Sequence, residues 1–411
     1  NIAIKMLLKG ISMTCYRGKT TYEQKQNSCP HKGDKVLVSL LVLACFLSNL
    51  SQLPAVVSVG MTQKLNMPIW IVLLVYLLIS GRVTVRYSSA KIMMLMTIIW
   101  CGMAILYFLT GINYYNSSVF GCLMLSMLMY LLGELSGKSL KEKDIEKITI
   151  AYVLSTTIVC LSIYQKFFSM GIDLTSRTYA YASKNSISQI IFTSIVILMF
   201  TEFKEKKLVN IIKVFVIAFQ FFLMMLLRSR ATIVGFIICI LYIVVKGTFS
   251  PKLKRTLSVI LIGMGIVLLT NDKFNNIIIN NILLANRDAK SLDSLTSGRI
   301  SILQSFPTLI QGHWLTGIGP LYFECFPLSV ILQFGCIIGA LILFVSYFPL
   351  LKSFQFKDYG KYGVIFVIIC IGYTINSFFE GLAPIGPGVK CYFMWLLFGI
   401  LSSKVAGGKQ G

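Results

Sequence analysis

Long apolar stretches recur along the chain and are separated by mostly short polar connections. Two of them, 92–109 and 327–351, are continuous and far exceed the ~10-residue alternating segments of a membrane β-barrel. A helix that crosses a bilayer needs ~20 mainly apolar residues and satisfies its own backbone hydrogen bonds. The pattern therefore predicts an all-α polytopic membrane protein with about 12 transmembrane helices. We expect these spans near residues 36–58, 66–80, 91–110, 118–136, 148–168, 186–203, 209–227, 231–246, 257–270, 326–351, 363–380 and 391–404.

One connection, residues 271–325, is much longer than the others. After Ser297–Gly298 its apolar residues recur at near-helical spacing, which predicts a short amphipathic helix at the membrane surface. The residues that define this spacing are Ile300, Leu303, Phe306 and Ile310. The spans at 66–80 and 257–270 are the shortest and fall below the usual length for a bilayer.

Composition agrees with a membrane location. The 411 residues are 56% hydrophobic and only 13% charged, with a mean hydropathy of +0.78, and a soluble domain could not cover so much apolar surface. The net charge of +23 does not indicate nucleic acid, because Lys and Arg gather in alternate connections as they do in membrane proteins. No Cys or His spacing is typical of a metal site, and we expect neither a metal nor a cofactor.

The same alternation predicts the orientation. One set of connections carries 26 of the 38 Lys and Arg residues, the other set carries 11, and Lys213 lies within a span. By the positive-inside rule both termini face the cytoplasm. The chain then has a basic cytoplasmic tail (1–35), a membrane domain (36–404) with one large extracytoplasmic loop (271–325), and a short cytoplasmic tail (405–411). We expect no cleavable signal peptide within the first 35 residues.

Several polar groups lie on the predicted outer side, where positive charge is scarce. One group precedes the sixth span, and anchoring at the headgroups explains it as well as binding does. It comprises Arg177, Tyr179, Tyr181, Lys184 and Asn185. A second group, Arg228 and Arg230, joins two spans with almost no loop. Because charge at membrane depth is costly and guanidinium binds phosphate oxygens in pairs, we favour a pyrophosphate clamp over headgroup contact.

The long loop supplies further candidates. Arg287 and Arg299 would each most often be a solvated charge, but Arg299 begins the expected helix, where an anion is favoured. Gly317 and Gly319 form a tight turn that brings backbone amides close to whatever occupies the site. His313 is either a general base or a side chain at the membrane interface.

Beyond the loop, Glu380 follows a span. It either orients a cation or accepts a proton, and a cap or simple ion pair is equally consistent with the sequence.

Taken in order, these segments resemble the bacterial O-antigen ligase and polysaccharide polymerase (Wzy-type) superfamily. The likeness covers about residues 150–400 and consists of short motifs. These are Arg177 to Asn185, Leu227-Arg228-Ser229-Arg230-Ala231, Ser297-Gly298-Arg299, Leu315 to Pro320, Leu332 to Gly339, and Phe378-Phe379-Glu380 with the Pro-rich turn that follows.

The resemblance implies a metal-independent glycosyltransferase at the outer face of the cytoplasmic membrane. Such enzymes move a glycan from undecaprenyl pyrophosphate to a sugar hydroxyl: a polymerase uses a second lipid-linked repeat unit, and a ligase uses a lipid A core. Flippase and chain-length regulator proteins are the implied partners. Arginines that stabilise the departing pyrophosphate suit this reaction, so we expect Arg228, Arg230 and Arg299 to do so, helped by Arg177 and Arg287.

One departure from the family concerns the base. Family members often carry a His-Asn pair between the Gly-x-Gly turn and the next span, and residues 321–328 here contain no histidine. His313, Glu324 and Glu380 remain as candidate bases. The departure favours a polymerase over a ligase.

Two other classes fit the pattern less well. A transporter, such as a lipid-linked oligosaccharide flippase, would have polar residues near the bilayer midplane, and Lys213 is the main candidate. The third hypothesis is a structural scaffold within a glycan-assembly complex that has no catalytic activity of its own.

Overall fold

The computed structural model describes residues 34–81, 87–169, 171, 184–201, 207–246, 251–276, 299–386 and 390–408. The chain divides into two compact units, Asn1–Lys35 and Val36–Gly411. The predicted basic tail (1–35) coincides with the first unit, and its residues 1–33 lie outside the described residues, so the description concerns the second unit.

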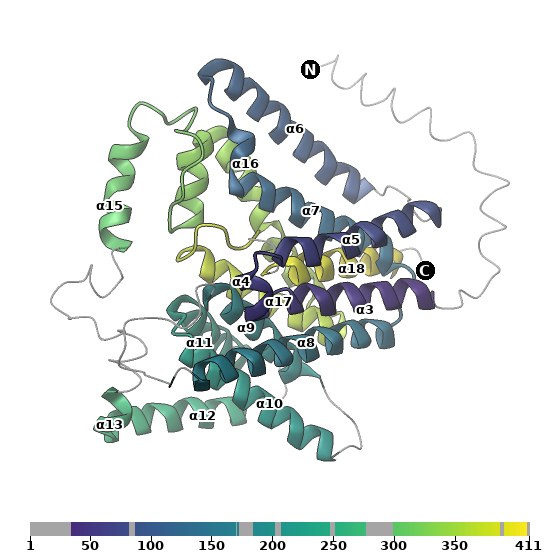
Figure 1. Ribbon diagram of the computed structural model, residues 1–411, viewed down its shortest axis with the longest axis vertical. Coiled ribbons are helices and arrows are strands. Elements are labelled where there is room, and N and C mark those ends of the chain that lie inside the picture. Colours follow the sequence, from purple (N-terminus) through teal and green to yellow (C-terminus); the bar gives the residue numbers. More distant parts are fainter. Residues whose placement is uncertain are drawn as a thin grey trace. The chain divides into compact units, whose positions relative to one another are not determined.

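The second unit is built from helices, and its described residues contain no strand. Figure 1 labels them along the chain. Their bounds are α3 Lys35–Leu50, α4 Pro54–Ser58, α5 Thr62–Ile79, α6 Tyr87–Thr110, η1 Tyr114–Asn116, α7 Ser118–Gly137, α8 Glu142–Ser169, α9 Lys184–Phe200, α10 Lys207–Leu226, α11 Arg230–Val245, α12 Pro251–Thr270, α13 Asp272–Asn275, α15 Arg299–Ile310, α16 Phe326–Phe356, α17 Gly360–Ser377 and α18 Tyr392–Gly408.

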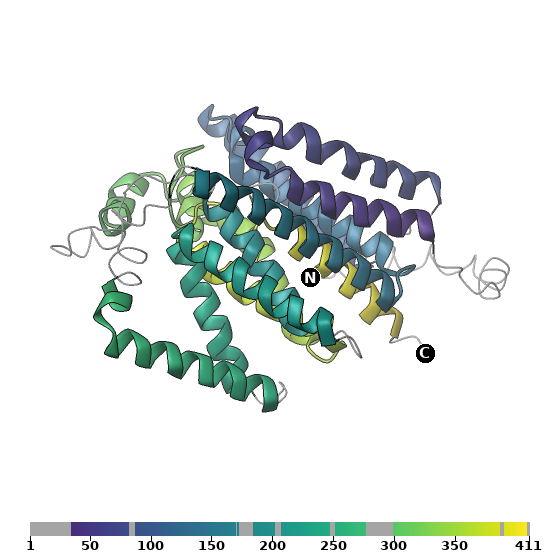
Figure 2. The same ribbon diagram turned by 60° about the horizontal axis from the view of Figure 1, so that its bottom comes forward.

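Eleven of the predicted spans each overlap one of these helices, and the first, 36–58, overlaps both α3 and α4. Within the described part of the chain, 6 helices are long and apolar enough to cross a membrane: α6, α7, α8, α10, α16 and α17. The chain therefore has the character of a membrane protein, and the full number of crossings stays a prediction. In the view of Figure 2 most helices of this unit lie side by side along a shared direction.

Some boundaries differ from the prediction. The span expected at 36–58 ends at Leu50 and is followed by the short helix α4, because the ring of Pro54 cannot continue a helix but is accepted at the start of a new one. Helices α5 and α12 are longer than predicted, with 18 and 20 residues, because both begin in polar sequence that the apolar pattern excluded.

The short helix predicted in the long connection is present as α15, but its packed face is different. Ile302, Phe306 and Ile310 pack with residues that lead into α16, whereas Leu303 is 43% exposed. A buried stripe at i, i+4 and i+8 explains this shift, because it turns Leu303 away from the contact.

Helices α7 and α18 form the closest pair and lie along one another in Figure 1. Three glycines bring their backbones together. A Cβ atom at Gly133 would overlap the Leu396 carbonyl oxygen, and one at Gly399 would overlap the Tyr130 carbonyl oxygen. Gly137 likewise faces the backbone of Ile400. Small residues at such contacts allow close van der Waals packing, which drives helix association where lipid removes the hydrophobic effect.

Buried hydrogen bonds tie the N-terminal helices to this pair. The Asn49 amide of α3 donates to the Tyr152 carbonyl and to the Ser155 and Thr156 hydroxyls of α8, at 3.0–3.1 Å. The Tyr392 hydroxyl of α18 donates to the Asn49 amide oxygen, 3.2 Å away. Asn49 therefore connects three helices without leaving a buried polar atom of its side chain unpaired.

Helix α16 is interrupted at Gly335, where φ is 71° and ψ is 177°. The segment before the helix pairs with the interruption: the Ile318 and Gly319 amides donate to the Leu332 and Gln333 carbonyls, and the Cys336 amide donates to the Trp314 carbonyl, at 2.8–3.2 Å. Gly335 and Gly317 are the points of closest approach, since a Cβ on either would overlap the backbone of the other segment.

We predict that Gly133→Ala destabilises the protein. The added methyl group meets a carbonyl oxygen at the α7–α18 contact, and overpacking of this kind costs about 1–3 kcal/mol. The measurement is thermal unfolding of the purified protein in detergent. Gly121→Ala is the matched control, because it lies in the same helix and a Cβ there has no neighbour within 4 Å. It should be neutral or stabilising, since Ala is the better helix former. Equal melting temperatures for the two variants would contradict the packing account.

Candidate functional site

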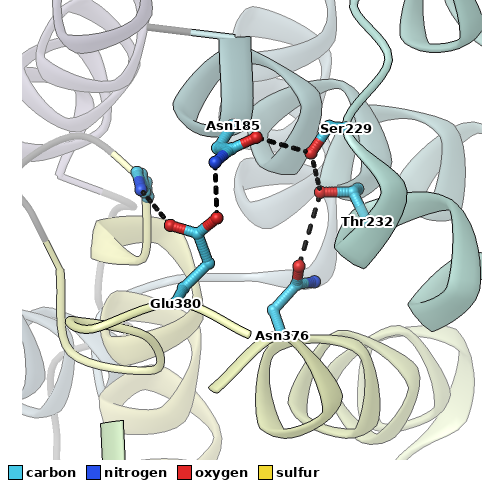
Figure 3. A network of polar contacts seen from close by, with 6 residues as sticks. Asn185, Ser229, Thr232, Asn376 and Glu380 are labelled. Carbon is cyan, nitrogen blue, oxygen red and sulfur yellow. Dashed lines mark hydrogen bonds and ion pairs between the residues drawn. The ribbon is translucent and has the colours of Figure 1, made fainter. Parts of the chain in front are cut away.

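A buried polar network joins the start of α9, the turn between α10 and α11, and the end of α17 (Figure 3). The Asn185 amide nitrogen donates to Glu380 Oε1 at 2.5 Å, and the Ser229 hydroxyl donates to Asn185 Oδ1 at 3.1 Å. Ser229 Oγ and Thr232 Oγ1 are 3.0 Å apart, and Thr232 Oγ1 is 3.4 Å from Asn376 Oδ1. Segments almost 200 residues apart in sequence thus meet at one place.

The network has a buried ion pair at one end. Lys390 Nζ lies 3.8 Å from Glu380 Oε2, and the two side chains are 6% and 9% exposed. The Tyr373 hydroxyl donates to the Lys390 carbonyl at 2.6 Å, which holds the backbone of Lys390 in place. Both carboxylate oxygens of Glu380 are therefore engaged, one by an amide and one by an ammonium.

The other end of the network carries two arginines. Helix α10 ends at Leu226 and α11 begins at Arg230, so the connection has only three residues. Arg228 has a φ of 52° and is the one non-glycine residue with positive φ among those described. Its backbone amide donates to the Met225 carbonyl at 3.0 Å, which closes the turn. A left-handed residue costs about 1–2 kcal/mol when it is not glycine, so the position carries some strain.

Positive charge exceeds negative charge in this cluster. Among the described residues of the network and its turn, Arg228 and Lys390 are only 4% and 5% exposed, and Glu380 is the buried carboxylate. Arg230 is half-buried in the first turn of α11. Ser229 directs its hydroxyl to Asn185 and makes no cap hydrogen bond to α11, so the positive end of that helix dipole adds to the same field. The cluster can therefore bind an anion.

The end of the long connection packs against this cluster. At Gly381 a Cβ would lie 2.6 Å from the Phe323 carbonyl oxygen and 2.9 Å from the Tyr322 ring. The residue after Glu380 thus touches the segment that precedes α16. Of the candidate bases in that stretch, Glu324 is half-buried and His313 is exposed.

The structure brings together part of the predicted site. Asn185, Arg228, Arg230 and Glu380 come from three separate motifs and lie in or next to the network, and Lys184 begins the helix that carries Asn185. Gly317 and Gly319 lie instead at the interruption of α16, where the Gly319 amide is engaged by Gln333.

The remaining candidates are not placed. Arg177, Tyr179, Tyr181 and Arg287 lie outside the described residues. Arg299 begins α15, and only its backbone is described.

Two network members were missed from the sequence. Lys390 had a signal: it is the one Lys or Arg between Lys361 and Lys404 and falls in a predicted outer connection, like the two arginines that were chosen. Thr232 had none, because a threonine inside an apolar helix is unremarkable until its neighbours are known.

Comparison of the chain with models of protein families and with curated proteins found no match.

We predict a strong thermodynamic coupling between Glu380 and Lys390. Removing one partner of a buried ion pair costs about 3–5 kcal/mol, because the other charge stays buried and unpaired. Glu380→Gln and Lys390→Met should each lower the melting temperature markedly, and the double variant should recover much of the loss. The measurement is a double-mutant cycle by thermal unfolding.

The control is the pair Lys147–Asp144, in which the lysine side chain is 64% exposed and the aspartate side chain 13%. Lys147→Met should change stability by less than about 1 kcal/mol. Additive losses at Glu380 and Lys390 would contradict the coupling.

Proposed function

We propose that this chain is a membrane glycosyltransferase that polymerises undecaprenyl-pyrophosphate-linked oligosaccharide repeat units into a surface polysaccharide. The observation that supports this most is the meeting of three separate motifs in one cation-rich cluster at the ends of α9, α11 and α17. These are the motifs on which the resemblance to Wzy-type polymerases depends.

The proposed topology has 12 crossings with both termini in the cytoplasm of the cell. The cluster then lies at the outer mouth of the bundle, in the cytoplasmic membrane. The imbalance of Lys and Arg between alternate connections supports this orientation. A donor whose undecaprenyl chain stays in the bilayer would present its pyrophosphate at this level.

The chemistry is a glycosyl transfer. A hydroxyl oxygen of the acceptor repeat unit attacks the anomeric carbon of the donor, the bond from that carbon to the phosphate oxygen breaks, and undecaprenyl pyrophosphate leaves. The hydroxyl proton passes to a base, for which His313, Glu324 and Glu380 are the candidates. Negative charge grows on the leaving group as the bond breaks, and fixed cations that face it lower the barrier.

Within the cluster we assign Arg228 and Arg230 to the pyrophosphate, and add Lys390. A planar guanidinium binds two phosphate oxygens at once, and an ammonium contributes a compact charge. Glu380 fits a positioning role better than that of the base, since Asn185 and Lys390 already engage both of its oxygens. Arg177, Arg287 and Arg299 remain proposed helpers.

Lys213 is the main candidate for the polar residue that a flippase would carry near the bilayer midplane. Its ammonium donates to the Thr201 carbonyl just beyond α9, at 2.7 Å. This contact gives Lys213 the role of closing a helix end, so polymerisation remains the better-supported proposal, with ligation to a lipid A core as the variant that differs only in its acceptor.

We predict that Arg230→Ala abolishes polymer while the protein accumulates normally. Loss of one fixed donor to a developing charge lowers turnover by about 100-fold or more. Arg230→Lys should retain part of the activity, because the charge remains without the paired hydrogen bonds. The measurement is conversion of purified lipid-linked repeat units into a ladder by the full chain in proteoliposomes.

Arg255→Ala is the control, because Arg255 is an exposed arginine in the connection predicted to face the cytoplasm. Polymer of unchanged length and yield in Arg230→Ala would remove the proposed role of the cluster.

We also predict where the substrate gathers when the gene is deleted. Without polymerisation, single repeat units should appear on the lipid carrier at the outer face and on the cell surface, with no long chains. Accessibility of the accumulated units to an added glycosidase, before and after the cells are opened, measures this. Units protected until the cells are opened would support the flippase and overturn the polymerase.

A further inference from the structure

Residues 314–319 take an unusual path for a connection between helices. They enter the interruption of α16 and take over the backbone hydrogen bonds that the interruption leaves open. The depth of this interruption relative to the bilayer decides whether the segment lies in water or in hydrocarbon. Two helices report that depth independently.

Helix α16 gives the first measure. No Asp, Glu, Lys or Arg occurs between Glu324 and Lys352. A spanning helix needs ~20 residues, and twenty residues counted back from Lys352 end at Leu332. Gly335 therefore lies inside the hydrocarbon even if the helix is untilted, and any tilt places it deeper.

Helix α6 gives the second. A Cβ at Gly102 would overlap the side chain of Ile338, so these two positions share one depth. Gly102 lies eight residues before Thr110, the end of α6, which is about 12 Å at 1.5 Å per residue. Ile338 lies three residues beyond Gly335. The interruption is therefore about 7–8 Å inside the end of α6, in agreement with the first measure.

The other residues of the segment 314–319 lie between the end of α6 and the level of the interruption of α16. A Cβ at Gly319 would lie 2.5 Å from Ile112, just past the end of α6. Trp314 is hydrogen-bonded to Cys336 at the interruption, and the Tyr114 hydroxyl donates to the Thr316 carbonyl at 3.0 Å. The chain therefore descends from the end of α6 at Gly319 to the level of the interruption at Trp314.

The segment also meets the conditions that lipid imposes. Irregular backbone at membrane depth is tolerated where it is buried in protein. Here Gly317 and Gly319 are buried, and hydrogen bonds to α16 and Tyr114 satisfy backbone groups of the segment. Its side chains are apolar where they face outward: Trp314 is 51% exposed and Leu315 is 66% exposed. Ile337 of α16, beside the interruption, is 62% exposed, so this surface continues the lipid-facing side of a candidate span.

We propose that residues 314–319 form a re-entrant segment inserted into one leaflet of the bilayer, with Trp314 and Leu315 in contact with lipid acyl chains. This changes the predicted large loop, whose last part then lies in the membrane instead of in water. The inference rests on packing and depth alone and stands apart from the glycosyl-transfer proposal. Gln311 is exposed three residues before Trp314, and the proposal expects it at the headgroup level, on the aqueous side of the segment.

Native tryptophan fluorescence tests this proposal without cysteine engineering. The chain has 4 Trp residues, of which Trp70 and Trp395 are buried and Trp100 is 49% exposed in α6. The emission of Trp314 is obtained by subtracting the spectrum of the Trp100→Phe, Trp314→Phe double variant from that of the Trp100→Phe variant. The full chain is placed in vesicles of phosphatidylcholine with or without bromine on the acyl chains, and iodide is added to the water.

The expected result is that acyl-chain bromine lowers the Trp314 emission at least twofold while iodide leaves it unchanged. Quenching by iodide, or by neither agent, would overturn the proposal. Two single tryptophans, introduced one at a time into the variant that lacks Trp100 and Trp314, provide the matched control. They also keep the test valid if Trp314→Phe itself disturbs the structure. Leu315→Trp should respond to bromine and Gln311→Trp to iodide, and an equal response of both to iodide would also overturn it.

Discussion

Burial of the Glu380–Lys390 ion pair is the constraint on which the arrangement of the cluster depends. Two charges removed from water are tolerated only when each is paired and the remaining polar atoms are hydrogen-bonded. Asn185 meets this need for the second oxygen of Glu380, Ser229 occupies the amide oxygen of Asn185, and Thr232 stands next to Ser229. The need to pair each buried polar atom thus links the end of α17 to the start of α9 and the start of α11. These hydrogen bonds fix the three helix ends relative to one another. Arg228 and Arg230 are held in place by the same chain of contacts.

The positions of the helices could be predicted from the sequence because lipid imposes a simple rule on them. Apolar runs of sufficient length must be helical, and every predicted span except the first overlaps a single helix. The predicted ends of the helices were wrong where hydropathy does not determine them. Polar residues extend α5 and α12 past their apolar parts, and Pro54 ends a run that hydropathy alone treats as continuous.

The candidate site could be predicted only in part, because the sequence marks unusual residues but not their neighbours. Arg228 and Arg230 were identified because they carry positive charge on the predicted outer side, where such charge is scarce. The same criterion could have identified Lys390. The pairing of Asn185 with Glu380 depends on how α9 packs on α17, which no local pattern contains. Gly317 was expected to bring amides to a ligand, whereas a Cβ atom there would meet the backbone of Gln333 and Gly335 in the interruption of α16. A glycine in the sequence indicates that another group approaches the backbone closely, but it does not identify that group.

The contact between α7 and α18 has a consequence for how the protein is made. The glycine face of α7 is covered only when α18 has been made, after every helix between them. At ordinary ribosomal rates this interval is on the order of tens of seconds. During biosynthesis α7 is therefore made long before the helix that covers its glycines, and a chain that ended before α18 would leave Gly133 and Gly137 without that packing partner.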